Sequence, residues 1–186
     1  QSYRTFMDEH LFHGLNIPSS QIHFPPNAGP GIVEKCQAYD QAIRDAGGID
    51  FQILGIGSNG HIGFNEPTSS LASLTRLKTL TDKTLRDNSR FYSEGETQPH
   101  LATTMGVGNI LEAKHIALQA FGSKKAEAVQ ASVEAPISAF WPGSALQLHP
   151  DTTFYLDDQS GSKLQLLDYY RRTQENAVKL EAEGML

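Results

Sequence analysis

The most constraining feature of the sequence is residues 49–57, IDFQILGIG, a nearly continuous apolar run that ends in glycines. A short apolar run bounded by glycines is typical of a strand, and the weak polar alternation predicts burial on both faces, as in a parallel sheet. Parallel strands need long crossover connections, which are usually helices. The run therefore predicts an α/β protein with a mostly parallel sheet.

Helical and strand patterns alternate along the rest of the chain. Apolar residues repeat at helical spacing within 31–46, where Gly47 and Gly48 form a stop signal, and again within 162–183. Further helices are expected over residues 2–13, 82–92, 107–113 and 124–135, the last capped by Ser123, and further strands over residues 75–81, 115–122 and 152–158. The alternation predicts a three-layer α/β/α sandwich with a Rossmann-like sheet, organised as one domain over residues 1–186.

The composition fits one globular domain, because 186 residues with 39% hydrophobic side chains can bury a sizeable core. The net charge of -6 is spread along the chain without a basic block, and no apolar run or leader suggests a membrane. We therefore expect neither nucleic acid nor a membrane as partner. Cys36 is the single cysteine and falls in a helical pattern, which predicts a core position and favours the reducing cytoplasm.

Gly55, Gly57 and Gly60 spell G-x-G-x-x-G directly after the apolar run, as in a dinucleotide-binding turn. Such a turn requires a long helix after the third glycine and an acidic residue roughly 20 positions further on. Asp82 fits the second requirement, but Pro67 follows too soon after Gly60 for a long helix. The pattern alone therefore only weakly supports a nucleotide site.

Polar residues are concentrated on the same turn, where Asn59, His61, Asn65 and Glu66 alternate with glycines. Taken singly, His61 reads as an ordinary loop histidine and Glu66 as a capping or surface carboxylate. Together, a histidine and a carboxylate at the end of a buried strand can exchange protons near neutral pH. The cluster therefore favours an acid–base catalytic site.

The chain closely resembles the glucosamine-6-phosphate deaminase family. The segments that carry the resemblance are LGIGSNGHIGFNEP, SSLASLTRLKTL, NSRFY, GVGNILEA, FGSKKAEAVQASVE and SALQLHP. The resemblance covers essentially the whole chain. It implies isomerisation and deamination of glucosamine 6-phosphate, a small-molecule substrate, to fructose 6-phosphate and ammonia, without a cofactor. Related sugar-phosphate lactonases share the G-x-G-x-[DN]-G-H turn but not the GFNEP that follows here.

The resemblance implies a role for each residue of the turn. His61 matches the histidine that shuttles the proton in ring opening, and Glu66 matches the glutamate paired with it. Asn59 stands where some members have an aspartate. An asparagine can orient His61 but stabilises its cation less well.

Arg90 and Lys125 resemble the family's ligands for the substrate phosphate, with the neighbouring Lys124 as an alternative. An Arg fork suits a phosphate, and Lys125 is expected in the first turn of a helix, where anions are favoured. Gly55 and Gly57 are expected to present their backbone to the sugar. The seven histidines are scattered without paired ligand spacing, so no metal is expected.

Four further residues, Ser69, Ser70, Arg76 and Lys78, resemble the positions at which hexameric members bind an allosteric amino-sugar phosphate. Monomeric, unregulated members also exist, so the resemblance leaves both a monomer and a homo-oligomer open.

The family begins with a strand, a phosphate loop and an Asp-Glu-Tyr segment whose Asp moves the C2 proton, and no such segment precedes Gln1. We therefore expect an N-terminally truncated domain that lacks its general base and is inactive alone. The alternatives are a lactonase on the same scaffold and a non-catalytic sugar-phosphate-binding remnant.

Overall fold

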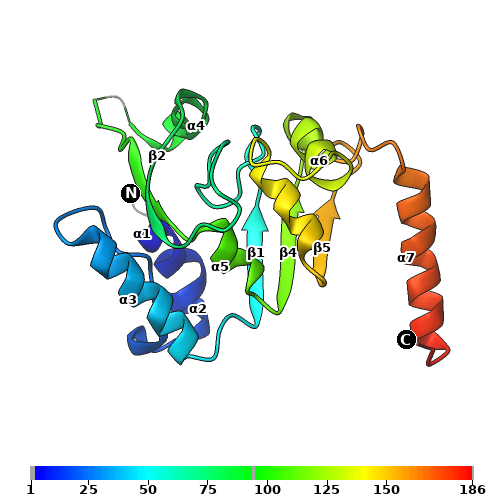
Figure 1. Cartoon of the computed structure of the whole chain (residues 1–186), viewed down its shortest axis with the longest axis horizontal. Helices are drawn as coiled ribbons and strands as arrows, with labels where there is room; N and C mark the ends of the chain where they lie inside the picture. The colour runs from blue at the N-terminus through cyan, green and yellow to red at the C-terminus, as the bar shows by residue number, and fades with distance from the viewer. Residues whose placement is uncertain (1–2, 94, 186) are drawn as a thin grey trace.

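A computed structural model describes residues 3–93 and 95–185 of the chain. Its centre is a three-stranded parallel sheet of order β1-β4-β5 (Figure 1). The strands are β1 (Phe51–Gly55), β4 (His115–Ala120) and β5 (Thr152–Leu156). All three were predicted from the sequence, and the α/β class with a mostly parallel sheet is confirmed.

The core lies between this sheet and the elements on one of its faces. These elements are α5 (Val107–Leu111), α6 (Ala126–Val133) and the 3-10 helix η5 (Pro142–Leu148). Leu54 and Leu118 of the sheet are buried against them together with Ile110, Val129 and Leu146. Burial of these apolar side chains fixes the sheet on α5 and α6, and so positions the loops after the strands.

The opposite face of the sheet is exposed. Phe51 and Ile53 of β1 retain 58% and 62% of their accessible surface, and Tyr155 of β5 retains 52%. The prediction that residues 49–57 are buried on both faces is therefore wrong, because no described element packs against that side of the sheet. Only alternate positions of β1, such as Leu54, face the core.

A second, two-stranded antiparallel sheet lies beside the first and consists of β2 (Arg76–Thr79) and β3 (Leu101–Thr104). Between them the chain forms α4 (Asp82–Asn88) and the 3-10 turn η3 (Ser89–Phe91), so the strand and the helix expected here are confirmed. The sequence analysis missed β3. Its four residues, LATT, are too short and too polar for a clear strand pattern.

The N-terminal helical segment comprises α1 (Tyr3–Met7), the π-helix η1 (Asp8–Phe12) and α2 (His13–Leu15). It continues past residue 13, the predicted end, and ends where Asn16 adopts a left-handed conformation. Residue 2, the predicted start, lies outside the described residues. After the 3-10 turn η2 (Ser19–Gln21) comes α3 (Ile32–Asp45), in which Cys36 is buried as predicted.

Gly47 and Gly48 end α3 as the sequence predicts. Both have positive φ, and their amides donate to the carbonyls of Arg44 and Ile43. Glycine adopts this left-handed conformation without steric cost, which is why the helix ends there.

A 3-10 turn, η4 (Ser123–Lys125), precedes α6. The prediction that Ser123 caps this helix is wrong, because the helix begins only at Ala126 and its N-terminus has no side-chain cap.

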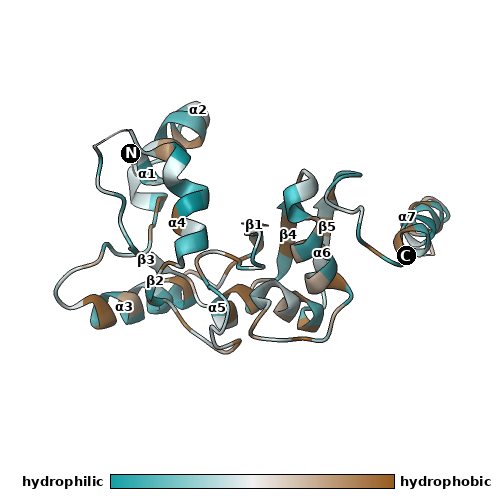
Figure 2. Cartoon of the chain, turned by 90° about the horizontal axis from the view of Figure 1, so that it is seen from above, coloured by the Kyte–Doolittle hydropathy of each residue, from teal (hydrophilic) through white to brown (hydrophobic). Residues whose placement is uncertain are grey.

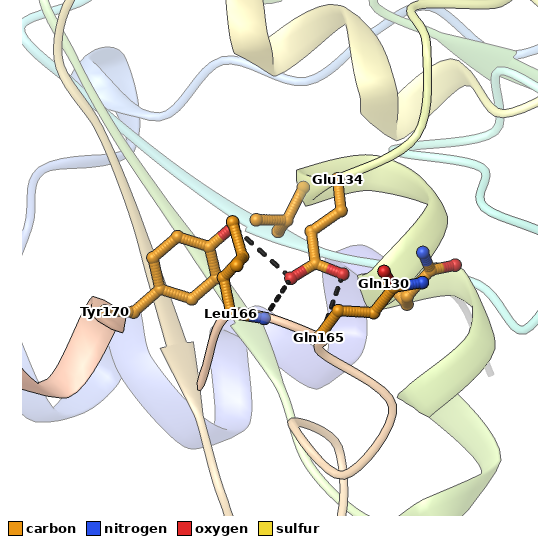
Figure 3. Close-up of a pocket in the computed structure, with 6 residues that line it drawn as sticks. Gln130, Glu134, Gln165, Leu166 and Tyr170 are labelled. Carbon is orange, nitrogen blue, oxygen red and sulfur yellow. Dashed lines mark hydrogen bonds between the residues drawn. The ribbon is translucent and has the colours of Figure 1, made fainter. Parts of the chain in front are cut away.

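The chain ends in α7 (Leu167–Ala182), which begins later than the predicted residue 162 and has no buried residue. Figures 1 and 2 both place α7 at one end of the molecule, away from the other helices. Glu134, just after α6, accepts hydrogen bonds from the amides of Gln165 and Leu166 and from the Tyr170 hydroxyl (Figure 3). No helix in the described part of the chain is long and apolar enough to cross a membrane.

Candidate active site

The glycine-rich turn after β1 brings His61 back over the end of the strand. The Gly57 amide donates to the His61 carbonyl at 2.8 Å, and the Gly60 amide donates to the Gly57 carbonyl at 2.9 Å. The imidazole lies directly on Gly57, because a Cβ added there would come within 2.3 Å of His61 Cε1. A side chain at position 57 would therefore displace the ring, and the glycine is needed for close approach.

His61 and Glu66 form the centre of the site. His61 Nδ1 lies 3.6 Å from Glu66 Oε2, and the two side chains retain 18% and 2% of their accessible surface. Asn59 Nδ2 donates to Glu66 Oε2 at 2.7 Å, and Asn59 Oδ1 accepts from the His61 backbone amide at 3.3 Å. The three residues expected to act together are thus adjacent, but the Asn59 side chain bonds the carboxylate and not the imidazole ring.

Two threonines at the start of α4 complete this cluster. Thr81 donates to Glu66 twice, through its amide at 3.3 Å and its hydroxyl at 3.2 Å. The same hydroxyl is the N-cap of α4 and accepts from the Thr84 amide. Thr84 Oγ1 lies 3.5 Å from His61 Nδ1. The sequence analysis gave these residues no role, and the only local signal was a threonine preceding a helical pattern.

These hydrogen bonds keep Glu66 ionised. Burial raises the pKa of Glu66, but hydrogen bonds from His61, Thr84 and Asn59 outweigh it and lower this pKa to about 2. The carboxylate is therefore charged at neutral pH and can only accept hydrogen bonds. This favours a proton on His61 Nδ1 and leaves Nε2 as the ring nitrogen that can take up a proton.

A second asparagine, the fully buried Asn65, connects the turn to the neighbouring two-stranded sheet. Asn65 Nδ2 donates to the carbonyls of Ile62 and Met105, and Asn65 Oδ1 accepts from Arg76 Nη1 at 2.9 Å. The Phe64 amide donates to Thr104 Oγ1 at 3.0 Å. The two-stranded sheet thus anchors the segment between His61 and Glu66, which makes the site rigid before a ligand binds.

The two residues expected to bind phosphate lie on separate elements. Lys125 Nζ donates to the Ile56 carbonyl at 2.6 Å, at the carboxyl end of β1, whereas Lys124 is exposed. Lys125 lies in η4 and not in the first turn of α6, so the helix-terminus argument for it is wrong. Arg90 is exposed and stacks on Phe91, with its guanidinium carbon 4.7 Å from the ring centroid.

Several charged groups near Lys125 affect the pKa of its ammonium. Burial lowers the pKa of the Lys125 ammonium, Asp87 raises it, and Arg90 and Lys83 lower it further. Lys83 also donates to the Ser58 carbonyl on the glycine-rich turn. Lys125 and Lys83 therefore both lie near the end of β1, and Lys83 was not predicted from the sequence.

The four residues expected at an allosteric site divide into two groups. Ser69 and Arg76 turn inward, and Ser69 Oγ and Arg76 Nη2 are buried without a hydrogen-bond partner among the described residues. Ser70 is exposed, and Lys78 is half-buried. Binding of an effector here stays a prediction, as does the approach of a sugar to Gly55 and Gly57.

The dinucleotide interpretation fails on local structure. Residues 67–75, which should belong to a long helix after Gly60, form only turns and irregular backbone. In residues 3–93 and 95–185 no group of three His, Cys, Asp or Glu side chains is placed to hold a metal ion.

The fold and the turn define an α/β protein with a histidine–carboxylate pair at the carboxyl end of a parallel sheet. The family model of glucosamine-6-phosphate isomerases/6-phosphogluconolactonase matches residues 1–155, and the chain belongs to this family. A glucosamine-6-phosphate deaminase of Hahella chejuensis is 55% identical over 181 residues, which are 97% of this chain and 69% of that protein. One of Shewanella loihica is 50% identical over 98% of this chain and 68% of its own length.

Solved structures give the same result. A monomeric glucosamine-6-phosphate deaminase superposes with a TM-score of 0.84 at 38% identity, over 88% of this chain and 68% of its own. A 6-phosphogluconolactonase from Leishmania guyanensis superposes with a TM-score of 0.62 at 19% identity, over 87% of this chain and 67% of its own. The second likeness shows a shared fold only.

Proposed function

We propose that the chain has glucosamine-6-phosphate deaminase activity and opens the sugar ring in this reaction, which converts glucosamine 6-phosphate and water to fructose 6-phosphate and ammonia. The observation that carries the proposal is the His61–Glu66 pair on a glycine turn, with Nδ1 and Oε2 3.6 Å apart and the buried carboxylate held by a hydrogen bond from Asn59. It lies within a sequence 55% identical to a glucosamine-6-phosphate deaminase. The lactonase alternative has no comparable support, because the lactonase structure shares the fold at only 19% identity.

In the proposed mechanism, His61 Nε2 takes the proton from the O1 hydroxyl of the pyranose and returns it to the ring oxygen. The C1–O5 bond breaks and the C1 aldehyde forms. The ionised Glu66, held by Asn59, stabilises the imidazolium that exists between the two transfers. A second base then moves the C2 proton to C1 while a proton passes from the amine nitrogen to O1, and water displaces ammonia from the resulting C2 imine to leave the ketone. No residue of this chain is assigned as that second base.

We propose that the substrate phosphate binds to Arg90 and Lys125. Arg90 is one of the charges that lower the pKa of the Lys125 ammonium, and Lys125 Nζ donates to the carbonyl of Ile56, just after the strand that leads into the glycine-rich turn. Binding a phosphate there would place the sugar against the turn. The binding energy of the distant phosphate then supplies positioning for the ring-opening step.

The proposal is tested by measuring ammonia release from glucosamine 6-phosphate and hydrolysis of 6-phosphogluconolactone side by side. Because this chain covers 69% of the Hahella chejuensis relative, the assay includes a chimera carrying the rest of that relative's sequence. We expect ammonia release by the chimera, and a loss of at least about 100-fold in kcat with little change in KM for His61→Ala. Lactone hydrolysis without ammonia release, or full activity of His61→Ala, would refute the proposal.

We further infer a cytoplasmic location, from the single buried thiol of Cys36 and the absence of any membrane-spanning helix in the described residues. The oligomeric state follows from light scattering of the purified chain. A monomer would agree with the solved monomeric deaminase, and a larger assembly would favour the effector-binding residues around Arg76.

A further inference from the structure

Thr84 is a buried residue of the site that the mechanism above does not use. It lies in the first turn of α4 and retains only 2% of its accessible surface. Its hydroxyl oxygen is 3.5 Å from His61 Nδ1 and 3.1 Å from Thr81 Oγ1. A buried hydroxyl needs hydrogen-bond partners, and these are the groups within its reach.

Helix capping does not explain this hydroxyl. Thr81 already caps α4, because its side chain accepts from the Thr84 amide. The Thr84 amide is used in the cap, but its hydroxyl points into the cluster around Glu66. The side chain is therefore oriented toward the catalytic pair and not toward its own helix.

The hydrogens can be assigned from the chemistry of the partners. Glu66 is ionised and only accepts, and it lies 3.6 Å from His61 Nδ1. A hydroxyl carries one hydrogen and two acceptor sites. With Glu66 on one side, Nδ1 must carry its proton, so Thr84 Oγ1 accepts from Nδ1. It also contacts Thr81 Oγ1 at 3.1 Å, and the Thr81 hydroxyl donates to Glu66.

We propose that Thr84 is a positioning residue that accepts from His61 Nδ1–H and connects it through Thr81 to the Glu66 carboxylate, and so fixes the imidazole tautomer whose Nε2 is free. The long distances from Nδ1 to both acceptors, 3.5 Å and 3.6 Å, indicate that neither holds the ring alone. Thr84 therefore controls which ring nitrogen takes up the proton. The proposal rests on the proposed role of His61 in ring opening.

The tautomer of His61 is read directly from long-range proton–nitrogen NMR spectra of the nitrogen-15-labelled chain, which needs no turnover. The variants are Thr84→Val, which keeps the shape and removes the hydroxyl, and Thr84→Ser, which keeps the hydroxyl. Thr173→Val is the matched control, because Thr173 is a helical threonine whose hydroxyl donates to the Tyr169 carbonyl of α7.

We expect wild type, Thr84→Ser and Thr173→Val to show Nδ1 protonated and Nε2 free at pH above the titration of the ring. Thr84→Val should show a mixture of both tautomers. In the chimera, Thr84→Val should lower kcat about 10-fold with KM changed less than about 2-fold, and Thr84→Ser should restore kcat.

An unchanged His61 tautomer in Thr84→Val overturns the proposal. If that variant does not fold, as judged by circular dichroism, Thr84→Ala replaces it under the same criterion. The tautomer and the turnover report separately. A hydroxyl-dependent tautomer without ammonia release by the wild-type chimera would contradict the proposed function and leave the Thr84 bridge intact.

Discussion

Two glutamates of this chain each accept several hydrogen bonds, yet they serve different regions. Glu66 lies in the glycine-rich turn after β1, retains 2% of its accessible surface and accepts hydrogen bonds from Asn59 and Thr81. Glu134 lies at the end of α6, is only partly buried, and is bound by two backbone amides and Tyr170 (Figure 3). A pocket of about 410 Å³ lies where Glu134 contacts Gln165, Leu166 and Tyr170, and none of the candidate site residues lines it.

The two carboxylates differ in the parts of the structure that their hydrogen bonds connect. Glu66 joins residues 59–84 into one buried cluster, so its loss would leave several donors without a partner. Glu134 joins α6 to the start of a helix with no buried residue. The comparison teaches that a count of hydrogen bonds does not measure importance, because burial sets the cost of breaking them.

The largest effect is expected from Glu66→Ala. The donors of Asn59 and Thr81 would lose their acceptor in a buried site, so the free energy of unfolding should fall by about 3 kcal/mol or more. Chemical denaturation measures this value, and ammonia release by the chimera should be abolished. Glu134→Ala is the matched control, with an expected loss of about 1 kcal/mol. Equal losses for the two variants would show that burial does not distinguish the sites.

The next effect is expected from Gly57→Ala, which tests the glycine under the imidazole. The new Cβ would collide with His61 Cε1, so the ring must move away from Thr84 and Glu66. Overpacking of this kind costs about 1–3 kcal/mol, and kcat should fall about 10-fold or more. Gly14→Ala is the control, since nothing lies within 4 Å of a Cβ at that helical glycine. Activity like wild type in Gly57→Ala would mean that the ring position is not catalytic.

The pH dependence of stability provides a third test. The pKa of Glu66 is lowered from its ordinary value of 4.5 to about 2, so the folded state binds its proton less readily than the unfolded state. The resulting stabilisation, about 3 kcal/mol, is complete above pH 4.5 and is lost as the pH falls toward 2. Urea denaturation between pH 7 and pH 3 should show the loss in wild type. Glu66→Gln should show a flatter profile, and an identical slope in both proteins would contradict the assignment.

The smallest effect on global stability is expected from Glu134→Gln. The amide loses the charge that strengthens the bonds from Gln165 and Leu166, so the start of α7 should open more often. Limited proteolysis of residues 157–166 should become faster, while the free energy of unfolding changes by less than about 1 kcal/mol. Arg171→Gln, which removes an exposed ion pair with Asp158, is the control. Unchanged proteolysis would show that Glu134 does not hold α7.

Local patterns predicted much of this molecule. The apolar run before Gly57 predicted β1, and the glycines after α3 predicted the end of that helix. Both predictions succeeded because a strand pattern and a left-handed backbone depend on nearby residues. His61 and Glu66 were found for the same reason, since they share one turn.

Contacts made across the fold were not predictable from those patterns. Thr81 and Thr84 reach the turn only because β2 directs the chain back over it, and nothing in their sequence marks them as partners of Glu66. The exposure of Phe51 and Ile53 likewise depends on which elements pack on the sheet, and an apolar run cannot specify this.

The central claim is that His61 opens the sugar ring, and the most direct test is exchange between the α and β anomers of glucosamine 6-phosphate. Ring opening alone interconverts the two anomers, so the measured exchange rate depends neither on the C2 base nor on ammonia release. Two-dimensional exchange NMR with the chain should show interconversion faster than in buffer, and His61→Gln should return it to the buffer rate. No acceleration by the wild-type chain and by the chimera, or an undiminished rate with His61→Gln, would contradict the account.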